Sequence, residues 1–481
     1  MKRHYIFLVS LLLPLGVIAQ KNQTDNSFTL DQCIQYALQS AISVKNSGVD
    51  QDIALAKVRE TRGIGLPQIN GNVSMIDNQN LRRFFAKTSV LSGFEPGITF
   101  PGLGPNDVVA SQNFFQLKNS SDIGLNFNQI IFNGSYIVGL QAANAYKDLA
   151  YKNANQTKES VIEQVSKAYY AALINLERID LFSSNIARVD SLLKNTVALR
   201  ANGFAEEIDV DRIQVSLNNL ITERDNFINV QTLSVELLKF QMNYPMDQEL
   251  SVAGDLSQIP VEVNIDDYLK DWDYRNRPDY RVLEANRRLQ ELTVKNNYAA
   301  GLPSISANAS LGYYMQSADF TQLFKPDVKF TSLDNGLLGP DKYYNYSSVG
   351  LTMNVPIFSG LQRTYRVQQE KLNLIKIDNN FRSLKSNVDL QVKQSTLTYQ
   401  NNLRSLQSQK RNMDLAMKVA KVTRIKYEQG VGSNLEVVEA ESSLKEAQVN
   451  YYNALYDVLV ARVNIDKAFG KLLGNSTSSS N

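Results

Sequence analysis

Four short segments of the chain alternate between apolar and small polar side chains. Residues 305–315 show the pattern most clearly, and residues 349–357, 123–128 and 69–75 repeat it. A period of two predicts strands with one apolar and one polar face. Lengths of about nine to eleven residues suit a tilted membrane-spanning strand, but also a half-buried sheet of a soluble protein. Alternation alone therefore leaves both interpretations open.

Two other segments predict very long helices. Residues 135–201 contain no proline and only one glycine, Gly139, and residues 361–429 contain neither residue type. In the first segment, apolar positions recur in steps of three, four or seven, which is coiled-coil spacing. At ~1.5 Å per residue each segment would form a rod about 100 Å long. Shorter helices are predicted at 31–62 and 205–243, and their combined length matches one long rod.

Three landmarks occur twice in the same order. Residues 65–69 (GLPQI) return as 301–305 (GLPSI), and 127–134 (FNQIIFNG) return as 353–360 (MNVPIFSG). The turn glycines Gly203 and Gly430 are each followed, five residues later, by an apolar–acidic–valine triplet. We therefore predict two tandem repeats, each running helix, strand, loop, strand, long helix, turn, helix. Their cores are 28–250 and 266–473.

The first residues are typical of a secretory signal. Lys2 and Arg3 precede an apolar run over 6–17, and residues 17–19 form a small-residue cleavage site. We therefore expect a signal peptide at 1–19, a first repeat at 20–250, a linker at 251–265, a second repeat at 266–473 and a disordered Ser/Asn-rich tail at 474–481. After residue 19 no apolar run reaches about 18 residues, so the exported chain either stays soluble or crosses an outer membrane as strands.

Composition argues against catalysis and against nucleic acid as a partner. Removing the signal takes away Lys2 and Arg3, which leaves 48 basic and 48 acidic residues. The single histidine, His4, lies in the signal, and the single cysteine, Cys33, is expected to be a small buried helix residue. No motif for a metal, a cofactor or a catalytic nucleophile is found. Catalysis by carboxylates alone stays possible, but nothing places two acids around a cleft.

Four strands cannot close a membrane barrel, which needs about eight. In lipid an unpaired sheet edge leaves backbone groups without partners. We therefore expect three copies to join. The predicted fold is mainly α-helical with a membrane β-barrel portion: coiled-coil hairpins plus four strands per protomer, completing a 12-stranded barrel and a helical tunnel as a homotrimer.

In these motifs the chain resembles the TolC-type outer-membrane efflux protein family. The resemblance rests on the repeated GLP-x-I, on Pro356-Ile357-Phe358-Ser359-Gly360 before the second long helix, and on Tyr427-Glu428-Gln429-Gly430 followed by residues 434–440. It implies a passive exit duct in the outer membrane that extends into the periplasm. It also implies partners: a periplasmic adaptor protein and an inner-membrane pump of the RND or ABC type.

The resemblance also implies functional positions. Glu436 and Glu439, spaced i, i+3 on one helix face, match the acidic ring of the periplasmic mouth. Their alternative interpretation is a solvated helix N-terminus, where the helix dipole favours acids. Tyr427 and Asp209 match a polar link that closes the mouth. Where the family can carry an arginine past the turn, this chain has Gly432, which leaves one closing link in doubt.

The alternative to an exit duct is an exported trimeric coiled-coil adhesin or envelope scaffold, which explains the helices but not four symmetric strands. The cargo is not predicted, because drugs, metals, dyes and proteins share this design.

Aromatic residues of the segments 77–120 and 316–346 either anchor at the lipid interface or pack loop on loop. They are Phe84, Phe85, Phe94, Phe100, Phe114, Phe115, Tyr343, Tyr344 and Tyr346.

Overall fold

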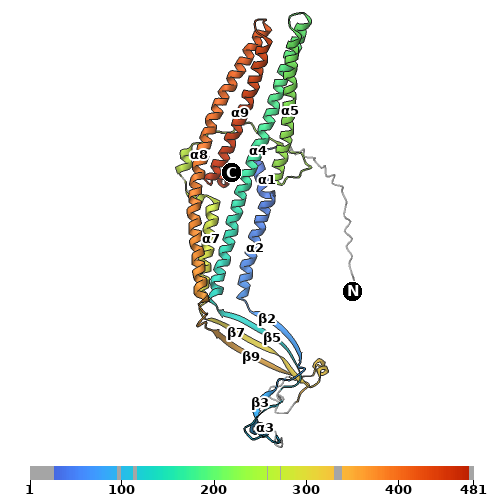
Figure 1. The fold of residues 1–481 in the computed structure, drawn as a ribbon, viewed down its shortest axis with the longest axis vertical. Helices are drawn as coiled ribbons and strands as arrows, with labels where there is room; N and C mark the ends of the chain where they lie inside the picture. Colours follow the sequence, from blue (N-terminus) through green and yellow to red (C-terminus); the bar gives the residue numbers. More distant parts are fainter. Residues whose placement is uncertain are drawn as a thin grey trace, which may run out of the picture. The chain divides into compact units, whose positions relative to one another are not determined.

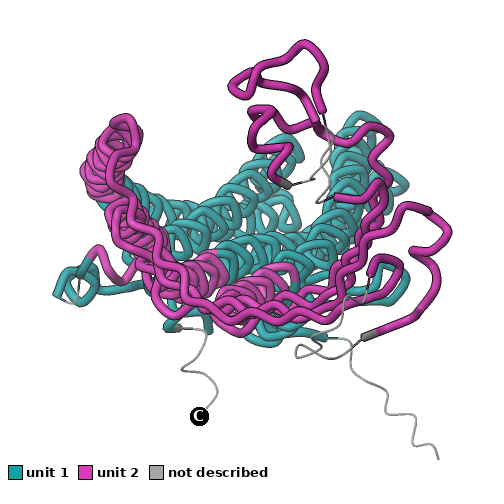
Figure 2. Tube along the Cα trace, turned by 90° about the horizontal axis from the view of Figure 1, so that it is seen from below, with its two compact units in different colours: residues 1–45, 157–273, 390–481 teal, residues 46–156, 274–389 magenta. Residues whose placement is uncertain are grey.

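The structure is a computed structural model that describes residues 27–94, 99–111, 116–256, 258–270, 272–329 and 339–475. The predicted signal peptide lies outside the described residues, and so does the tail after residue 475. The chain divides into two compact units (Figure 2). Unit 1 comprises 1–45, 157–273 and 390–481, and unit 2 comprises 46–156 and 274–389. Each unit therefore takes segments from both halves of the sequence.

The two long helices are confirmed. Helix α4 (Gly134–Ala201) has 68 residues and α8 (Gln362–Glu428) has 67. Each is followed by a short turn and a partner helix (Figure 1), α5 (Glu207–Met242) after α4 and α9 (Asn434–Ala468) after α8. The absence of proline and the near absence of glycine allow such lengths, because either residue would weaken the backbone ladder.

The helix predicted at 31–62 is two helices, α1 (Leu30–Ser40) and α2 (Ile42–Ile64), so that prediction was wrong at one point. Ala41 between them is extended, with φ −56° and ψ 132°. The break has a long-range cause. The side-chain amide of Asn243 donates to the Ser40 carbonyl at 3.0 Å, and Asn243 itself adopts a left-handed conformation after α5.

Unit 1 has a core of apolar side chains drawn from α1, α4, α5, α8 and α9. The predicted linker contains the short strand β6 (Ser251–Val252), which pairs in parallel with β1 (Ser27–Phe28), and the short helix α6 (Ile265–Lys270) begins at its end. The 3₁₀ helix η1 (Tyr274–Asn276) begins the second segment of unit 2, and α10 (Leu472–Asn475) is the last described element. Fully buried core residues include Cys33, Val165, Leu238, Met242, Val458, Leu459 and Ile465.

Unit 2 contains the predicted strands. They are β2 (Gln68–Asp77), β5 (Asn119–Phe132), β7 (Ser304–Ser317) and β9 (Tyr343–Asn354). They lie side by side in that order, each antiparallel to the next (Figure 1), and the short β8 (Val328–Lys329) pairs in parallel with the start of β9. The strand predicted at 349–357 begins earlier and ends at Asn354. Pro356 lacks the N–H that a longer ladder would need.

The remaining elements of unit 2 lie around this sheet. Helix α7 (Pro278–Ala299) leads into β7. The segment between β2 and β5, predicted only as a connection, contains a small antiparallel pair, β3 (Phe84–Lys87) and β4 (Val108–Ser111), and the short helix α3 (Thr88–Phe94). The segment between β7 and β9 contains the 3₁₀ helix η2 (Phe320–Phe324).

Candidate functional site: the strand surface and the helix tips

One face of the sheet is apolar and uncovered in the protomer. On β9 the exposed fractions are 88% for Val349, 76% for Leu351 and 61% for Met353. Ile69 and Val73 of β2 are equally open, at 66% and 68%. A continuous exposed apolar surface of this kind marks contact with a membrane or another protein.

The opposite face is lined by amides and hydroxyls that bond across the strands. Asn126 donates to Asn72 at 2.8 Å, and Ser310 donates to Asn126 at the same distance. A second chain runs from Asn128 through Asn308 to Thr352 in three neighbouring strands. These side chains need polar surroundings, so this face suits contact with water and the other face suits contact with lipid.

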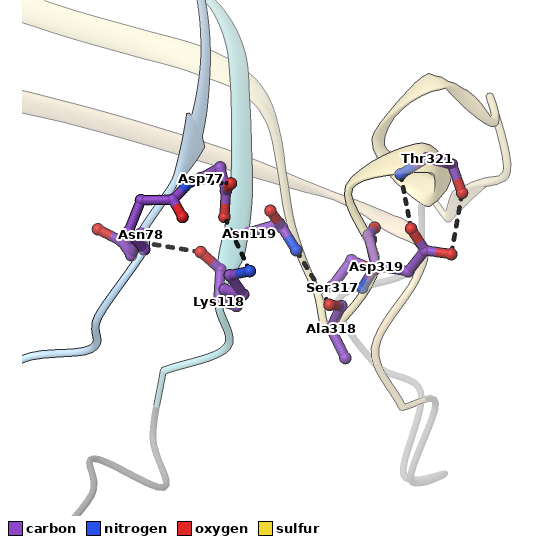
Figure 3. Close-up of polar contacts among 9 residues, drawn as sticks. Asp77, Asn78, Lys118, Asn119, Ser317, Ala318, Asp319 and Thr321 are labelled. Carbon is purple, nitrogen blue, oxygen red and sulfur yellow. Dashed lines mark hydrogen bonds and ion pairs between the residues drawn. The ribbon is translucent and has the colours of Figure 1, made fainter.

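A polar cluster marks the end of the sheet that lies away from the long helices (Figure 3). The Asp77 carboxylate is 3.8 Å from the Lys118 ammonium, and Asn119 donates to the Ala318 carbonyl at 3.1 Å. Asp319 caps the first turn of η2 by accepting from Thr321. The apolar band cannot continue through charged and amide groups, so the cluster bounds it.

The aromatic residues near the strand ends have mixed environments. Tyr343 is buried and donates to the Leu323 carbonyl at 2.6 Å, so it packs loop on strand. Tyr346 lies on the polar face, where its hydroxyl is 3.2 Å from Asp122. Phe85 is 74% exposed. Phe114, Phe115 and the side chain of Phe94 lie outside the described residues.

The two helix turns have the same construction. Gly203 and Gly430 have φ of +78° and +75°, in the left-handed region. In each turn the glycine N–H bonds the carbonyl three residues back, and the following residue, Phe204 or Val431, bonds the carbonyl five residues back. This is the Schellman arrangement that ends helices at glycine. Both predicted turn glycines are thus placed at the tips of helix pairs.

Tyr427 and Asp209 lie near these tips but bond to other groups. The Tyr427 hydroxyl is 3.2 Å from Thr196 of α4, and Thr196 in turn donates to the Leu192 carbonyl, so the tyrosine is the donor. The Asp209 side chain accepts from the Glu206 N–H, while its carbonyl accepts from Asn434 of α9 at 2.7 Å. The two side chains are therefore not paired with each other in the protomer.

A charged pair that sequence reasoning missed joins the two hairpins. Arg188 of α4 and Glu441 of α9 form a forked contact with distances of 2.9 to 3.0 Å, and Glu441 is only 7% exposed. Lys445 of α9 and Glu223 of α5 add a second pair at 2.8 Å. No sequence signal distinguishes Arg188 from the other basic residues of its long helix, because the pairing depends on which helices pack.

Glu436 and Glu439 are both exposed near the start of α9. The Glu436 N–H bonds the Ser433 side chain at 3.2 Å, so Glu436 also occupies the dipole-favoured first turn. Neither carboxylate has an ion-pair partner in the part of the chain that the structure describes. A buried or paired acid would be poorly suited to attract cations, and these two are neither.

Two negative findings apply to the described ranges alone. Within them, no helix is both long enough and apolar enough to span a bilayer. Nor do three or more histidine, cysteine or acidic side chains gather there in a way that would hold a metal ion.

Comparison with known proteins agrees with these features. The sequence profile described as "Outer membrane efflux protein" matches residues 274–471. The chain is 24% identical over 479 residues to "Outer membrane protein TolC" of Escherichia coli (strain K12), covering 96% of this chain and 85% of that protein. It is 23% identical to "Nodulation protein T" of Rhizobium leguminosarum bv. trifolii, over 71% of this chain and 69% of that one.

Solved structures share the fold. The open state of the Neisseria gonorrhoeae MtrE outer membrane channel superposes with a TM-score of 0.67 at 17% identity, covering 92% of this chain and 89% of that one. The Campylobacter jejuni CmeC outer membrane channel gives 0.60 at 19% identity, covering 97% and 94%.

A sheet with one apolar and one polar face, joined to very long helical hairpins, is the architecture that this chain shares with solved outer-membrane channels. Residues 274–471 match the outer membrane efflux protein family, and nearly the whole chain is similar in sequence to a TolC outer membrane protein.

Proposed function

We propose that three copies of this chain close into one barrel and tunnel and act as a passive exit duct. The observation that carries the proposal is the pair of unpaired sheet edges. The outer edge of β2, over its 10 residues, has no partner strand among the described residues. On β9 only Tyr343 and Tyr344 pair with β8, which leaves 345–354 open, a stretch of equal length.

These edges fit one another. Successive strands alternate in direction, so β9 of one copy and β2 of the next meet antiparallel. Joining them in a ring satisfies every backbone group in lipid, and an open edge there would cost several kcal/mol per group, or about 2–7. Three copies supply twelve strands, enough for a membrane barrel.

A cross-linking experiment tests the closure. The chain has one cysteine, Cys33, which is buried, so paired cysteines can be introduced without background labelling. Ser74→Cys on β2 combined with Ser348→Cys on β9 should give, with a short thiol cross-linker, a ladder that ends at three chains. Ser120→Cys with Ser348→Cys is the matched control, because β5 is an interior strand. A ladder that continues beyond three, or no ladder, would contradict the proposal.

The tandem repeat organisation is part of this proposal. We take 1–19 as a removed signal, 20–250 and 266–473 as repeats and 251–265 as their linker. Of the tail expected at 474–481, Gly474 and Asn475 belong to α10 and the rest lies outside the described residues. Support comes from the nearly equal lengths of α4 and α8, 68 and 67 residues, and from the matching hydrogen bonds at the Gly203 and Gly430 turns.

The proposed partners are a periplasmic adaptor and an inner-membrane pump of the RND or ABC type, which supplies the energy. Phe204 and Val431, directly after the turn glycines, are 79% and 77% exposed. Apolar side chains at both tips give an adaptor a surface to cover. Phe204→Ser with Val431→Ser should abolish co-purification with the adaptor while leaving the trimer intact.

Opening of the duct would separate the hairpins at their tips, a motion about element ends. The bonds Tyr427–Thr196 and Asn434–Asp209 and the pair Arg188–Glu441 hold them together in the protomer. Gly432 offers no side chain to this network, and an added Cβ there would lie 3.1 Å from Lys426 and from the Tyr427 nitrogen. The closing links of this chain thus use residues other than an arginine at that position.

Six carboxylates, Glu436 and Glu439 of three copies, would surround the narrow mouth. Such a ring attracts cations. Replacing both residues by glutamine should weaken block by added multivalent cations in single-channel recordings. Unchanged cation block would contradict the proposed role of the ring. If the variant still conducts, the proposed duct is not contradicted.

A further inference from the structure

On the strands β2, β5, β7 and β9, the polar face of the sheet carries one carboxylate and no lysine or arginine. Of the positions on that face of β2, β5, β7 and β9, all are amides, hydroxyls, glycines or apolar residues except Asp122. Asp122 stands near the start of β5, at the end of the sheet remote from α4. In a barrel lined by neutral groups, a single carboxylate per copy dominates the local field.

The contacts of Asp122 leave it available to a ligand. Its Oδ1 accepts from the Asn72 amide at 2.6 Å and from the Tyr346 hydroxyl at 3.2 Å. No described residue bonds Oδ2, and no lysine or arginine of the described chain forms an ion pair with Asp122. The side chain is half-buried, so solvent reaches it. Two donors hold the carboxylate in place without neutralising its charge.

Tyr346 reaches Asp122 because two glycines make room for it. The tyrosine stands on β9, and its hydroxyl crosses β7 to reach β5. A Cβ at Gly124 would lie 2.8 Å from this hydroxyl, and one at Gly312 would lie 2.9 Å from it. Gly124 and Gly312 are paired in neighbouring strands. Their lack of side chains lets the ring lie along the sheet surface.

We propose that Asp122 is a cation-recognising residue of the barrel bore, positioned by Tyr346 and Asn72. The proposal rests on the proposed trimeric duct, in which three copies place three carboxylates at one level of the bore. It is separate from the Glu436 and Glu439 ring, which stands on the helix tips. Its ligands are cations in transit, inorganic or organic, and anions would be disfavoured at this level.

Planar-bilayer recordings test this position. In a background with Glu436→Gln and Glu439→Gln, the reversal potential under a KCl gradient reports the selectivity of the rest of the bore. Asp122→Asn is expected to move that potential toward zero and to weaken block by hexamminecobalt(III) several-fold. Asp77→Asn is the matched control, because Asp77 lies at the same end of the sheet on the opposite face and pairs with Lys118. It should change neither quantity.

The outcomes separate the two proposals. If the background protein forms no conducting channel, the proposed duct fails. If it conducts and Asp122→Asn leaves both the reversal potential and the block unchanged, the role of Asp122 is overturned. Tyr346→Phe keeps the carboxylate and removes one donor, so it should preserve the sign of the selectivity. A loss equal to that of Asp122→Asn would also overturn the proposal, because the charge would not be the determinant.

Discussion

Individual residues of this chain show where sequence reasoning succeeds and where it stops. Cys33 was predicted to be a small buried residue of a helix, and it has no exposed surface. Its neighbours in the pattern made that prediction possible. Arg188 and Glu441 were not predicted as partners, since they are 253 residues apart and only the packing of α4 on α9 brings them together. The sequence identifies Tyr346 as an aromatic residue that anchors or packs. That its ring lies over Gly124 and Gly312 depends on the strand register, which the sequence does not predict.

Thiol labelling checks the environment of Cys33. Burial raises the pKa of its thiol to about 12, and only the thiolate reacts readily. N-ethylmaleimide should therefore leave the folded protein unlabelled at pH 8 and label it fully after denaturation. Rapid labelling of the folded protein would show that α1 opens easily or is packed differently.

Truncation of the Arg188–Glu441 pair should loosen the two hairpins. Glu441→Ala leaves a largely buried arginine without its carboxylate, and we expect a loss of about 2 kcal/mol, below the range for fully buried pairs because Arg188 keeps some solvent contact. Amide exchange in α4 and α9 near the pair should accelerate roughly thirtyfold. The double variant Arg188→Met/Glu441→Leu is the control, and it should recover most of the protection. Equal exchange in all three proteins would show that the pair does not hold the hairpins.

At the scale of elements, local patterns predicted most of the helices and strands. Coiled-coil spacing predicted α4, the absence of proline and glycine predicted α8, and alternation predicted the four long strands, because all three signals depend on near neighbours in sequence. The break at Ala41 was missed because its cause, the Asn243 amide on the Ser40 carbonyl, lies 203 residues away. The η2 segment was missed because its packing on Tyr343 has no periodic signature.

The hairpin turns give a prediction at this scale. Alanine at Gly203 or Gly430 must adopt a positive φ, which costs about 1–2 kcal/mol per residue. Each substitution should lower the thermal midpoint of helix unfolding and increase amide exchange at its own tip. Gly139→Ala is the matched control in the interior of α4, where an added Cβ meets no atom within 4 Å. It should stabilise the protein by about 0.5–1 kcal/mol. If Gly139→Ala destabilised the protein while the substitutions at Gly203 and Gly430 did not, the role of positive φ at the turns would be contradicted.

At the scale of the whole molecule, the sequence predicts that one chain supplies only part of a membrane barrel. Four strands per chain are too few to enclose a bore, and β2 and most of β9 present open edges beside an apolar face. In the proposed trimer, the carboxylates of Asp122, Glu436 and Glu439 would surround a common axis. These features do not predict the cargo, because the polar face of the sheet carries mainly neutral amides and hydroxyls, which suit many solutes.

The stoichiometry of the detergent-extracted protein tests this account most directly. Native mass spectrometry of the mature chain, purified from outer membranes in a mild detergent, should give a single species of three chains. No stable population should persist in buffer without detergent, because the apolar strand surface would then be exposed to water. A monodisperse single chain in detergent-free buffer would contradict the account.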